Sequence, residues 1–355
     1  MPMTDIHGEL ASLYASQELP SHDDLLFLTD QAISLLEEEA SSYRPEEKTA
    51  DGKKAGGLLD FTQAPLLPLI VVPDLHARAD FFLHLMEYPL EKLGIGHSCG
   101  EGDESGRQTA LTVLDGLALG RLRLVCVGDL FHSEKRGQLR WLAAWDEYQK
   151  GNYESKEMTA EMLENLILFQ MVLRVKNEYP RHFHFLKGNH ENILNESGRG
   201  NYPFRKFADE GNMVYDFMLS HYGDALLHLM SLWEHALPVC AAFPSCVVSH
   251  AEPKHFFSRK EIIAMRKNPD LVLGLTWTAN DEADEGSVEK TLCGLLGREG
   301  AKNAVWISGH RPVPEKYALR QGGRLVQIHN PFFEQIALLQ PGKIFNPETD
   351  IILLR

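Results

Sequence analysis

Five short polar motifs occur in order along this chain of 355 residues, and their side chains are of the types that bind divalent metal ions. The motifs are Asp74-Leu75-His76, Gly128-Asp129, Gly188-Asn189-His190-Glu191, Ser249-His250 and Gly309-His310. In Asp-x-His at the end of a strand, the two side chains point the same way and can reach one ion. Asp129 follows a glycine that permits a sharp turn, and its two carboxylate oxygens can bridge two ions. Each motif alone is weak, but five in order favour a metal site.

The donor atoms of these motifs indicate which ions and which chemistry to expect. Carboxylate, amide and imidazole ligands suit Mn, Fe, Zn or Co, and the motifs contain no cysteine for a thiolate zinc site. Two divalent ions beside two aspartates leave a positive field that fits an anionic phosphoryl group. The motifs therefore predict a two-metal phosphoesterase site, with Mn as the ion that we expect to support activity in vitro.

The motifs require elements that hold them in place, and each motif follows an apolar run with strand character. These runs cover residues 66–72, 122–127, 183–186, 246–248 and 305–307. Helical patterns over residues 135–150 and 157–178 alternate with the runs, which favours the α/β class. A further helix is expected from Ser21 to about residue 36, and residues 43–57 and 94–106 are expected to be loops.

The motifs and the segments around them resemble the calcineurin-like metallophosphoesterase superfamily, and they are most similar to its serine/threonine phosphoprotein phosphatases. The resemblance covers residues 66–335 and includes three further segments: Asn177–Phe183, Leu232–Ala242 and Thr276–Asp281. It implies a β-sandwich flanked by helices, in four αββα layers. We expect residues 61–355 to form this catalytic domain and residues 1–60 to form an N-terminal helical extension with a mobile loop.

The resemblance also assigns roles to individual residues. It implies that Asp74, His76 and Asp129 hold one metal, and that Asp129, Asn189, His250 and His310 hold the other. A water activated by the two metals would attack phosphorus in line, and His190 would protonate the leaving oxygen. Glu191 is expected to orient a neighbouring loop or histidine rather than to bind metal.

The chain departs from the family pattern after its second motif. The family continues Gly-Asp-x-x-Asp-Arg-Gly, whereas this chain has His132, Ser133 and Glu134 at the last three positions. The aspartate that orients the catalytic histidine is thus replaced by His132, which either positions His190 or only packs in the core. The arginine that grips phosphate is replaced by Ser133. The protein must then recruit another cation or use a different substrate, and the candidate cations are Arg199, Arg205, Lys206, Arg259 and Arg311.

Three functions are compatible with this pattern. The favoured one is hydrolysis of phosphate monoesters, on proteins or small molecules. The missing arginine makes a nucleotide-directed hydrolase of the same fold, acting on dinucleoside polyphosphates or cyclic nucleotides, the main alternative. A non-catalytic metal-binding scaffold is the third.

Composition and charge limit the partners and the setting of the protein. The net charge of −15 disfavours nucleic acid. We expect no membrane partner and a cytoplasmic protein, because the sequence shows neither a signal peptide nor an apolar run of membrane-spanning length.

Overall fold

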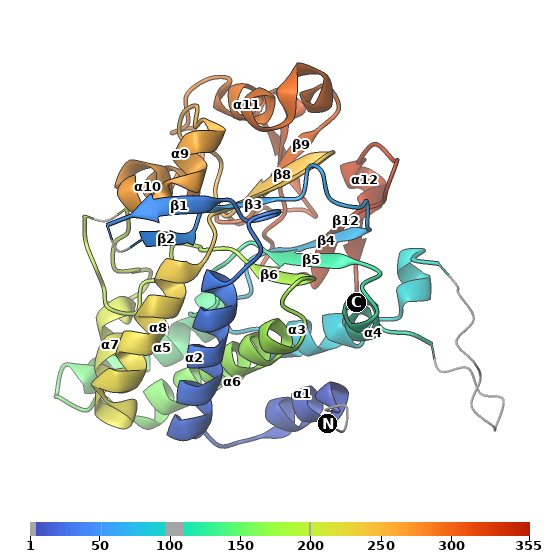
Figure 1. Ribbon diagram of the computed structural model, residues 1–355. Helices are drawn as coiled ribbons and strands as arrows, with labels where there is room; N and C mark the ends of the chain where they lie inside the picture. The colour runs from blue at the N-terminus through green and yellow to red at the C-terminus, as the bar shows by residue number, and fades with distance from the viewer. Residues whose placement is uncertain (1–4, 51, 97–109, 199) are drawn as a thin grey trace, which may run out of the picture.

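A computed structural model describes residues 5–50, 52–96, 110–198 and 200–355, and it contains two large β-sheets that pack face to face (Figure 1). The first sheet has the strand order β13 (Ile351–Leu353), β12 (Gln335–Leu339), β4 (Leu69–Val72), β5 (Arg123–Cys126), β6 (Phe183–Phe185). The second sheet has the order β10 (Ala318–Arg320), β11 (Leu325–Gln327), β9 (Val305–Ser308), β8 (Cys246–Ser249), β7 (Cys240–Phe243), β3 (Leu58–Asp60). A separate antiparallel pair consists of β1 (Glu46–Thr49) and β2 (Gly52–Ala55).

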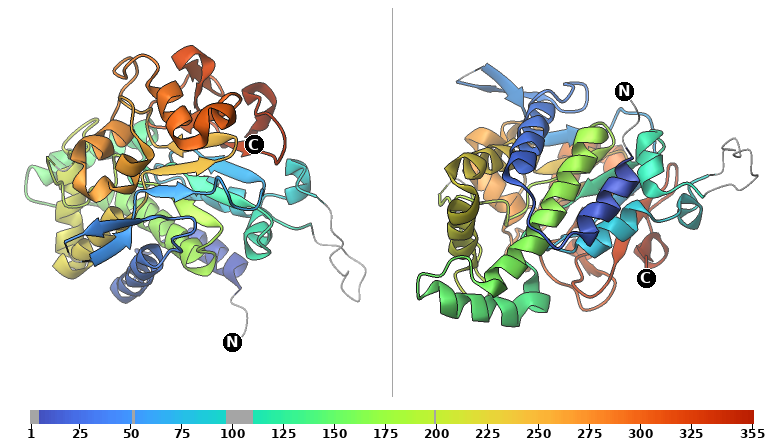
Figure 2. Two further views of the ribbon diagram at one scale, coloured as in Figure 1. Left: turned by 45° about the horizontal axis from the view of Figure 1, so that its top comes forward. Right: turned by 90° about the horizontal axis from the view of Figure 1, so that it is seen from below.

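Helices cover the outer face of each large sheet (Figures 1 and 2). The first sheet is covered by α1 (Ile6–Ala15), α2 (His22–Glu37), α3 (Ala79–Met86), α4 (Val113–Ala118), α5 (Gln138–Tyr148), α6 (Lys156–Glu178), α7 (Glu210–Tyr222) and α8 (Asp224–Ala236). The second sheet is covered by α9 (Arg259–Ile263), α10 (Pro269–Thr276) and α11 (Ser287–Ala301). Short elements complete the chain: α12 (Pro347–Asp350) and the 3₁₀ helices η1 (Leu90–Leu93), η2 (Glu134–Gly137), η3 (Met265–Lys267) and η4 (Gln321–Gly323). None of the described helices is long and apolar enough to cross a membrane.

Alternating side chains of the strands explain the four layers. In β4, Ile70 and Val72 belong to the core under the helices of the first sheet, whereas Leu69 and Val71 belong to the core between the sheets. In β8, Val247 points to the helices of the second sheet, while Val248 points inward. A strand with both faces buried reads as a continuous apolar run, as these strands do. The αββα architecture expected from the sequence is confirmed.

The predicted helices and loops have mixed outcomes. Helices were expected over residues 135–150 and 157–178, and α5 and α6 lie there. Ser21 caps α2 by accepting a hydrogen bond from the backbone N–H of Asp24. The interpretation of residues 43–57 as a loop is wrong, because β1 and β2 pair there and Glu47 is buried, accepting from the backbone N–H of Arg266. Most of the loop expected at residues 94–106 lies outside the described residues.

A buried network of charges joins the first 60 residues to the rest of the chain. The Arg44 guanidinium, fully buried, donates to Glu39 and to the backbone carbonyls of Gly56 and Ala236. Glu39 also accepts from Lys176 Nζ of α6, at 2.7 Å. The predicted boundary at residue 60 stays a prediction. A boundary there would separate Arg44 and Glu39 from their partners Ala236 and Lys176.

Replacement of Glu39 by Gln tests the weight of this network. Burial raises the pKa of Glu39, but Lys176, Arg44 and His184 outweigh it and hold the pKa well below its usual value. Glu39→Gln leaves two buried cations poorly compensated, so the free energy of unfolding at pH 7 should fall by about 3–5 kcal/mol. Because the folded-state pKa is depressed, the wild type loses this contribution as the pH falls below about 4. The difference between the two proteins in urea unfolding should therefore shrink from pH 7 to pH 3.

The control for this experiment is Glu46→Gln, which removes an exposed ion pair with Lys53. Its effect should be small at either pH, because an ion pair in water contributes little to stability. An equal, small effect of both substitutions would contradict a structural role for the buried network.

Candidate metal centre

The six predicted ligands lie at the carboxyl ends of parallel strands, and their donor atoms converge. β4, β5 and β6 are parallel to one another, as are β8, β9 and β11. Because side chains that follow parallel strands meet at one edge of each sheet, the motifs are brought together although they are far apart in sequence. Five of the six are at least nine-tenths buried, namely Asp74, His76, Asp129, Asn189 and His250.

Four of the predicted ligands form one group. Asn189 Oδ1 lies 2.9 Å from His250 Nε2 and 3.0 Å from His310 Nδ1. His250 Nε2 lies 3.2 Å from His310 Nδ1 and 3.4 Å from Asp129 Oδ2. Atoms that bind one ion at about 2.1 Å lie roughly 3–3.5 Å from one another. These spacings are therefore suited to a single ion.

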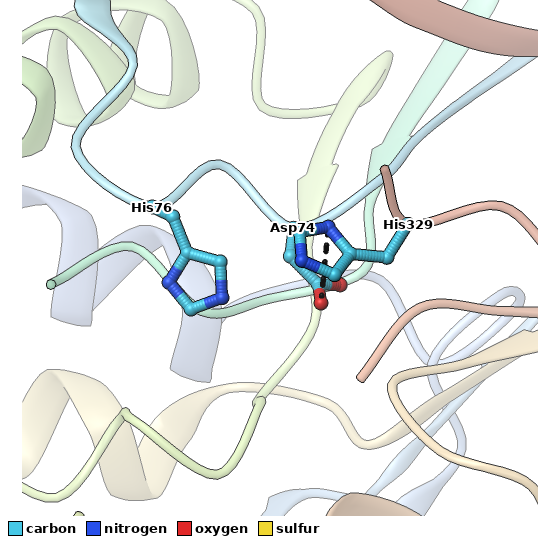
Figure 3. Close-up of side chains that lie close together, drawn as sticks. All are labelled: Asp74, His76 and His329. Carbon is cyan, nitrogen blue, oxygen red and sulfur yellow. Dashed lines mark ion pairs between the residues drawn. The ribbon is translucent and has the colours of Figure 1, made fainter. Parts of the chain in front are cut away.

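The other predicted ligands form a second group that shares Asp129. His76 Nε2 lies 3.6 Å from Asp129 Oδ2, the oxygen that also faces His250. Asp74, His76 and His329 place ligand atoms within 4.8 Å of one another (Figure 3). His190, predicted as the proton donor, lies close enough to share an ion with His76 and Asp129. The buried Asp and His clusters can thus hold two ions with Asp129 between them.

Hydrogen bonds on the outer side of each ring fix how two of the histidines face the site. Nδ1 of His76 lies 3.2 Å from the carbonyl of Phe131, and Nδ1 of His250 lies 3.1 Å from the carbonyl of Val127. A carbonyl only accepts, so both Nδ1 atoms carry the proton and both Nε2 lone pairs face the carboxylates. Metal-binding histidines have this arrangement because the outer hydrogen bond sets the tautomer.

The electrostatics of the site call for a cation. Burial raises the pKa of Asp74 to about 6, and burial with Glu191 and Asp74 raises the pKa of Asp129 well above its usual value. Burial lowers the pKa of His76 and of His310, in each case to about 3. Among the described residues, buried Asp74 Oδ1 and His310 Nε2 have no hydrogen-bond partner. Carboxylates and neutral imidazoles that converge without a counter-charge are what a divalent ion would neutralise, so the residues fit the predicted metals.

The backbone around the site is held in unusual conformations. His76, Asp129 and His310 all have positive φ, of 44°, 53° and 63°. Such residues persist only where the surroundings impose them, as happens at functional sites. At Gly309, a Cβ would collide with the Asp74 carboxylate, so this motif needs a glycine for close approach.

Two charged side chains fix the loops that carry the ligands. The Glu191 carboxylate accepts from the backbone N–H groups of Asp129, Leu130 and Gly188, which confirms the expectation that it orients a neighbouring loop. The buried Arg78 guanidinium donates to the carbonyls of Asp74, at 2.7 Å, and Phe333, at 2.9 Å. The loop after β4 is thereby tied to the loop after β11.

His132 contacts His190 without a hydrogen bond between them in the described part of the chain. The two ring centroids lie 5.5 Å apart in an edge-to-face arrangement. His132 Nδ1 accepts from the backbone N–H of Glu134, and its Nε2 lies 3.5 Å from Glu210 Oε1. His190 itself stacks on Phe204 with centroids 4.4 Å apart. An orienting effect of His132 on His190 stays a prediction, and it would act through packing.

His329, which none of the five sequence motifs contains, lies beside Asp74 and His76. His329 follows β11 in the segment Ile328-His329-Asn330 and is fully buried. The signal was present, because a polar residue after an apolar run is the pattern of the other motifs. It was missed because the resemblance provides no ligand at this position.

Substitution of Asp129 tests whether its carboxylate serves a cation. The raised pKa means that the folded, metal-free protein is destabilised by the charged form as the pH rises. Asp129→Asn should therefore resist urea better than the wild type in chelator at pH 7. It should also bind Mn²⁺ more weakly at one site at least, by more than about 10-fold. Urea unfolding and elemental analysis measure the two effects.

Asp209→Asn is the matched control, since Asp209 pairs with Arg205 outside the candidate site. It should leave metal content unchanged. Full metal content in Asp129→Asn would contradict the assignment.

Comparison by sequence found no match for the chain, whereas comparison by structure found similar proteins. No protein-family model and no curated protein matches the chain. A protein serine/threonine phosphatase from Saccharomyces cerevisiae, similar to human phosphatase PP5, aligns over 99% of this chain and 95% of its own, with 12% identity and a TM-score of 0.58. A cold-active protein-tyrosine phosphatase from Shewanella aligns over 84% and 82%, with 13% identity and a TM-score of 0.45. A putative diadenosine tetraphosphatase aligns over 84% and 97%, with 11% identity and a TM-score of 0.40. The order of the strands, the buried Asp and His clusters and the first of these alignments show that the chain has the calcineurin-like metallophosphoesterase fold.

Proposed function

We propose that the protein is a metal-dependent phosphoesterase that hydrolyses phosphate monoesters, in the manner of a phosphoprotein phosphatase. The observation that carries this proposal is the pair of donor groups that share Asp129 Oδ2, with His190 beside them. Asp74, His76 and Asp129 would hold one ion, and Asp129, Asn189, His250 and His310 the other. When bound, Mn, Fe, Zn or Co would lower the pKa of water and offset charge on the phosphoryl oxygens.

His190 is the proposed proton donor to the leaving oxygen. Its backbone N–H donates to Asp129 Oδ1 at 2.9 Å, and its ring is fixed by the stack on Phe204. Burial and then the neighbouring His76 and His132 lower the pKa of His190 well below its usual value. The free ring is therefore neutral near pH 7, and an anionic phosphoryl group beside it would raise that pKa and favour protonation.

The residue that grips phosphate must differ from the arginine of the family. Ser133 Oγ donates to Glu161 at 2.7 Å and so is bound to α6. Of the five candidate cations, Arg199 lies outside the described residues, while Arg205 pairs with Asp209 and Arg259 with Asp60. Lys206 is neutralised by Glu134, at 2.7 Å.

Arg311 is the candidate that we propose for phosphate binding. It follows His310 directly and is exposed, and its charge is among the causes that lower the pKa of His310. It makes no ion pair within the described ranges. A planar guanidinium beside the candidate metal site is suited to a phosphoryl group.

The loss of the second-motif arginine also supports the nucleotide-directed alternative. A site with a single exposed arginine grips a terminal phosphoryl group less firmly, so a substrate with further phosphates would gain from added contacts. Substrate tests must therefore include both classes.

A substrate panel with added Mn²⁺ tests the function. We expect metal-dependent hydrolysis of aryl phosphates and of phosphoserine or phosphothreonine peptides. Arg311→Ala should raise KM for these esters by about 10-fold, since a charged hydrogen bond contributes roughly 1.5–3 kcal/mol. Arg205→Ala, an exposed arginine on the surface, should leave KM unchanged.

Other outcomes of the panel select the alternatives. Rapid cleavage of a dinucleoside polyphosphate or a cyclic nucleotide, with aryl phosphates untouched, would establish the nucleotide-directed reading. Metal binding with no hydrolysis of any ester would favour the third function, a non-catalytic metal-binding scaffold.

Replacement of His190 separates chemistry from binding. His190→Asn should slow hydrolysis of a phosphoserine peptide by about 10²–10⁴-fold. The loss should be smaller for nitrophenyl phosphate, because nitrophenolate leaves without a proton and the serine alkoxide does not. Parallel kcat measurements on the two substrates check this, with the exposed His228→Asn as control. Equal losses on both substrates would contradict the role as proton donor.

A further inference from the structure

Glu134 occupies a position where the backbone favours glycine. Its φ is +52°, in the left-handed region, and the residue is only 4% exposed. A side chain other than glycine in this region costs roughly 1–2 kcal/mol. The resembling family has glycine at this point of its second motif. A buried carboxylate kept in a strained conformation suggests a function for the carboxylate itself.

The contacts of this carboxylate lead to His329. Glu134 Oε2 lies 3.1 Å from His329 Nε2, and Oε1 lies 2.7 Å from Lys206 Nζ. A carboxylate that pairs with cations accepts hydrogen bonds, so Nε2 of His329 carries the proton. In the neutral ring, Nδ1 is then left with its lone pair.

The free nitrogen of His329 faces the candidate metal site. Nδ1 is buried, has no hydrogen-bond partner among the described residues and lies 3.5 Å from Asp74 Oδ2 (Figure 3). A lone pair beside a carboxylate oxygen is unfavourable unless a proton or a metal ion compensates it. This spacing matches that of two ligands on one ion.

The loop that carries His329 is held against the loop that carries Asp74. Arg78 donates to the carbonyl of Asp74, and its Nη1 also lies 3.3 Å from the carbonyl of Asn330. Arg78 thus holds the backbone at Asp74 and beside His329, and Glu134 holds the His329 ring through its Nε2 atom.

We propose that His329 is a ligand of the ion held by Asp74 and His76, and that Glu134 is the carboxylate that positions it. The inference rests on the two-metal site of the proposed function. It gives the first ion four protein ligands, Asp74, His76, Asp129 and His329, as many as the second ion has.

Metal binding to the full chain tests this inference without any substrate. In titrations with Mn²⁺ or Co²⁺ alone, His329→Asn and Glu134→Gln should each weaken one site by about 10–100-fold and leave the other unchanged. Removal of a nitrogen ligand should also change the visible absorption of the Co²⁺ protein. Glu134→Gly removes both the carboxylate and the backbone strain, and it should likewise bind one ion more weakly.

His221 and Glu154 provide the matched control, because they form a similar pair 2.8 Å apart on the surface. His221→Asn and Glu154→Gln should change neither metal affinity nor the Co²⁺ spectrum. If His329→Asn fails to fold, the two Glu134 variants decide the matter.

The proposal would be overturned if both Glu134 variants bound both ions with wild-type affinity and the Co²⁺ spectrum of both was unchanged. The outcome is independent of the substrate panel. The variants could each bind one ion more weakly while the wild type hydrolyses no ester. That result would refute the proposed function and leave the role of His329 as a ligand standing.

Discussion

Burial of negative charge at the strand ends is the constraint on which the rest of the structure depends. Asp74 and Asp129 are at most 2% exposed, and Glu191 lies beside them at 1%. An isolated buried carboxylate is strongly unfavourable, and a protein normally neutralises it with a proton, a cation or hydrogen bonds. Glu191 receives three backbone N–H groups, whereas the aspartates receive one each, from His310 and His190. The aspartates are therefore the groups that a proton or an external cation would stabilise.

The scaffold tolerates this repulsion because several independent devices fix the loops. Parallel strands hold the bases of the loops, Glu191 joins the second motif to the third, and Arg78 joins the loop after β4 to the loop after β11. Positive φ angles at His76, Asp129 and Glu134 show that the loops adopt conformations they would not take alone. A site fixed in this way loses little entropy when an ion binds, because its ligands are already oriented.

Local patterns in the sequence were sufficient for the α/β class and for the strand ends, whereas the four-layer fold and the grouping of the six ligands came from the family resemblance. An apolar run followed by a polar motif identifies a strand and its carboxyl end, and parallel strands bring those ends together. The sequence was insufficient where a position depends on tertiary contacts. β1 and β2 pair within residues 43–57, and Glu47 of β1 accepts a hydrogen bond from the backbone N–H of Arg266, 219 residues away in the chain. The partner of His132 is likewise Glu210, on a helix that no pattern links to the second motif. His329 had the right local pattern, and the structure places it beside Asp74 and His76.

His132, Ser133 and Glu134 replace the family's Asp-Arg-Gly after the second motif. They change the charge of the site, which bears on the substrate. Relative to the family pattern, Ser133 removes a positive charge, Glu134 adds a negative one, and His132 in place of an aspartate removes a negative one. Alone, this change would repel a phosphate monoester, which carries two charges near neutral pH. Lys206 Nζ lies 2.7 Å from Glu134, so its positive charge offsets the added carboxylate. The position of the family's arginine still lacks a positive charge, which Arg311 can supply from the loop after β9. A monoester thus remains compatible with the site, but it would be held from the side of the fifth motif rather than the second. Discrimination between substrates would then depend on what the loop around Arg311 can contact beyond the phosphoryl group.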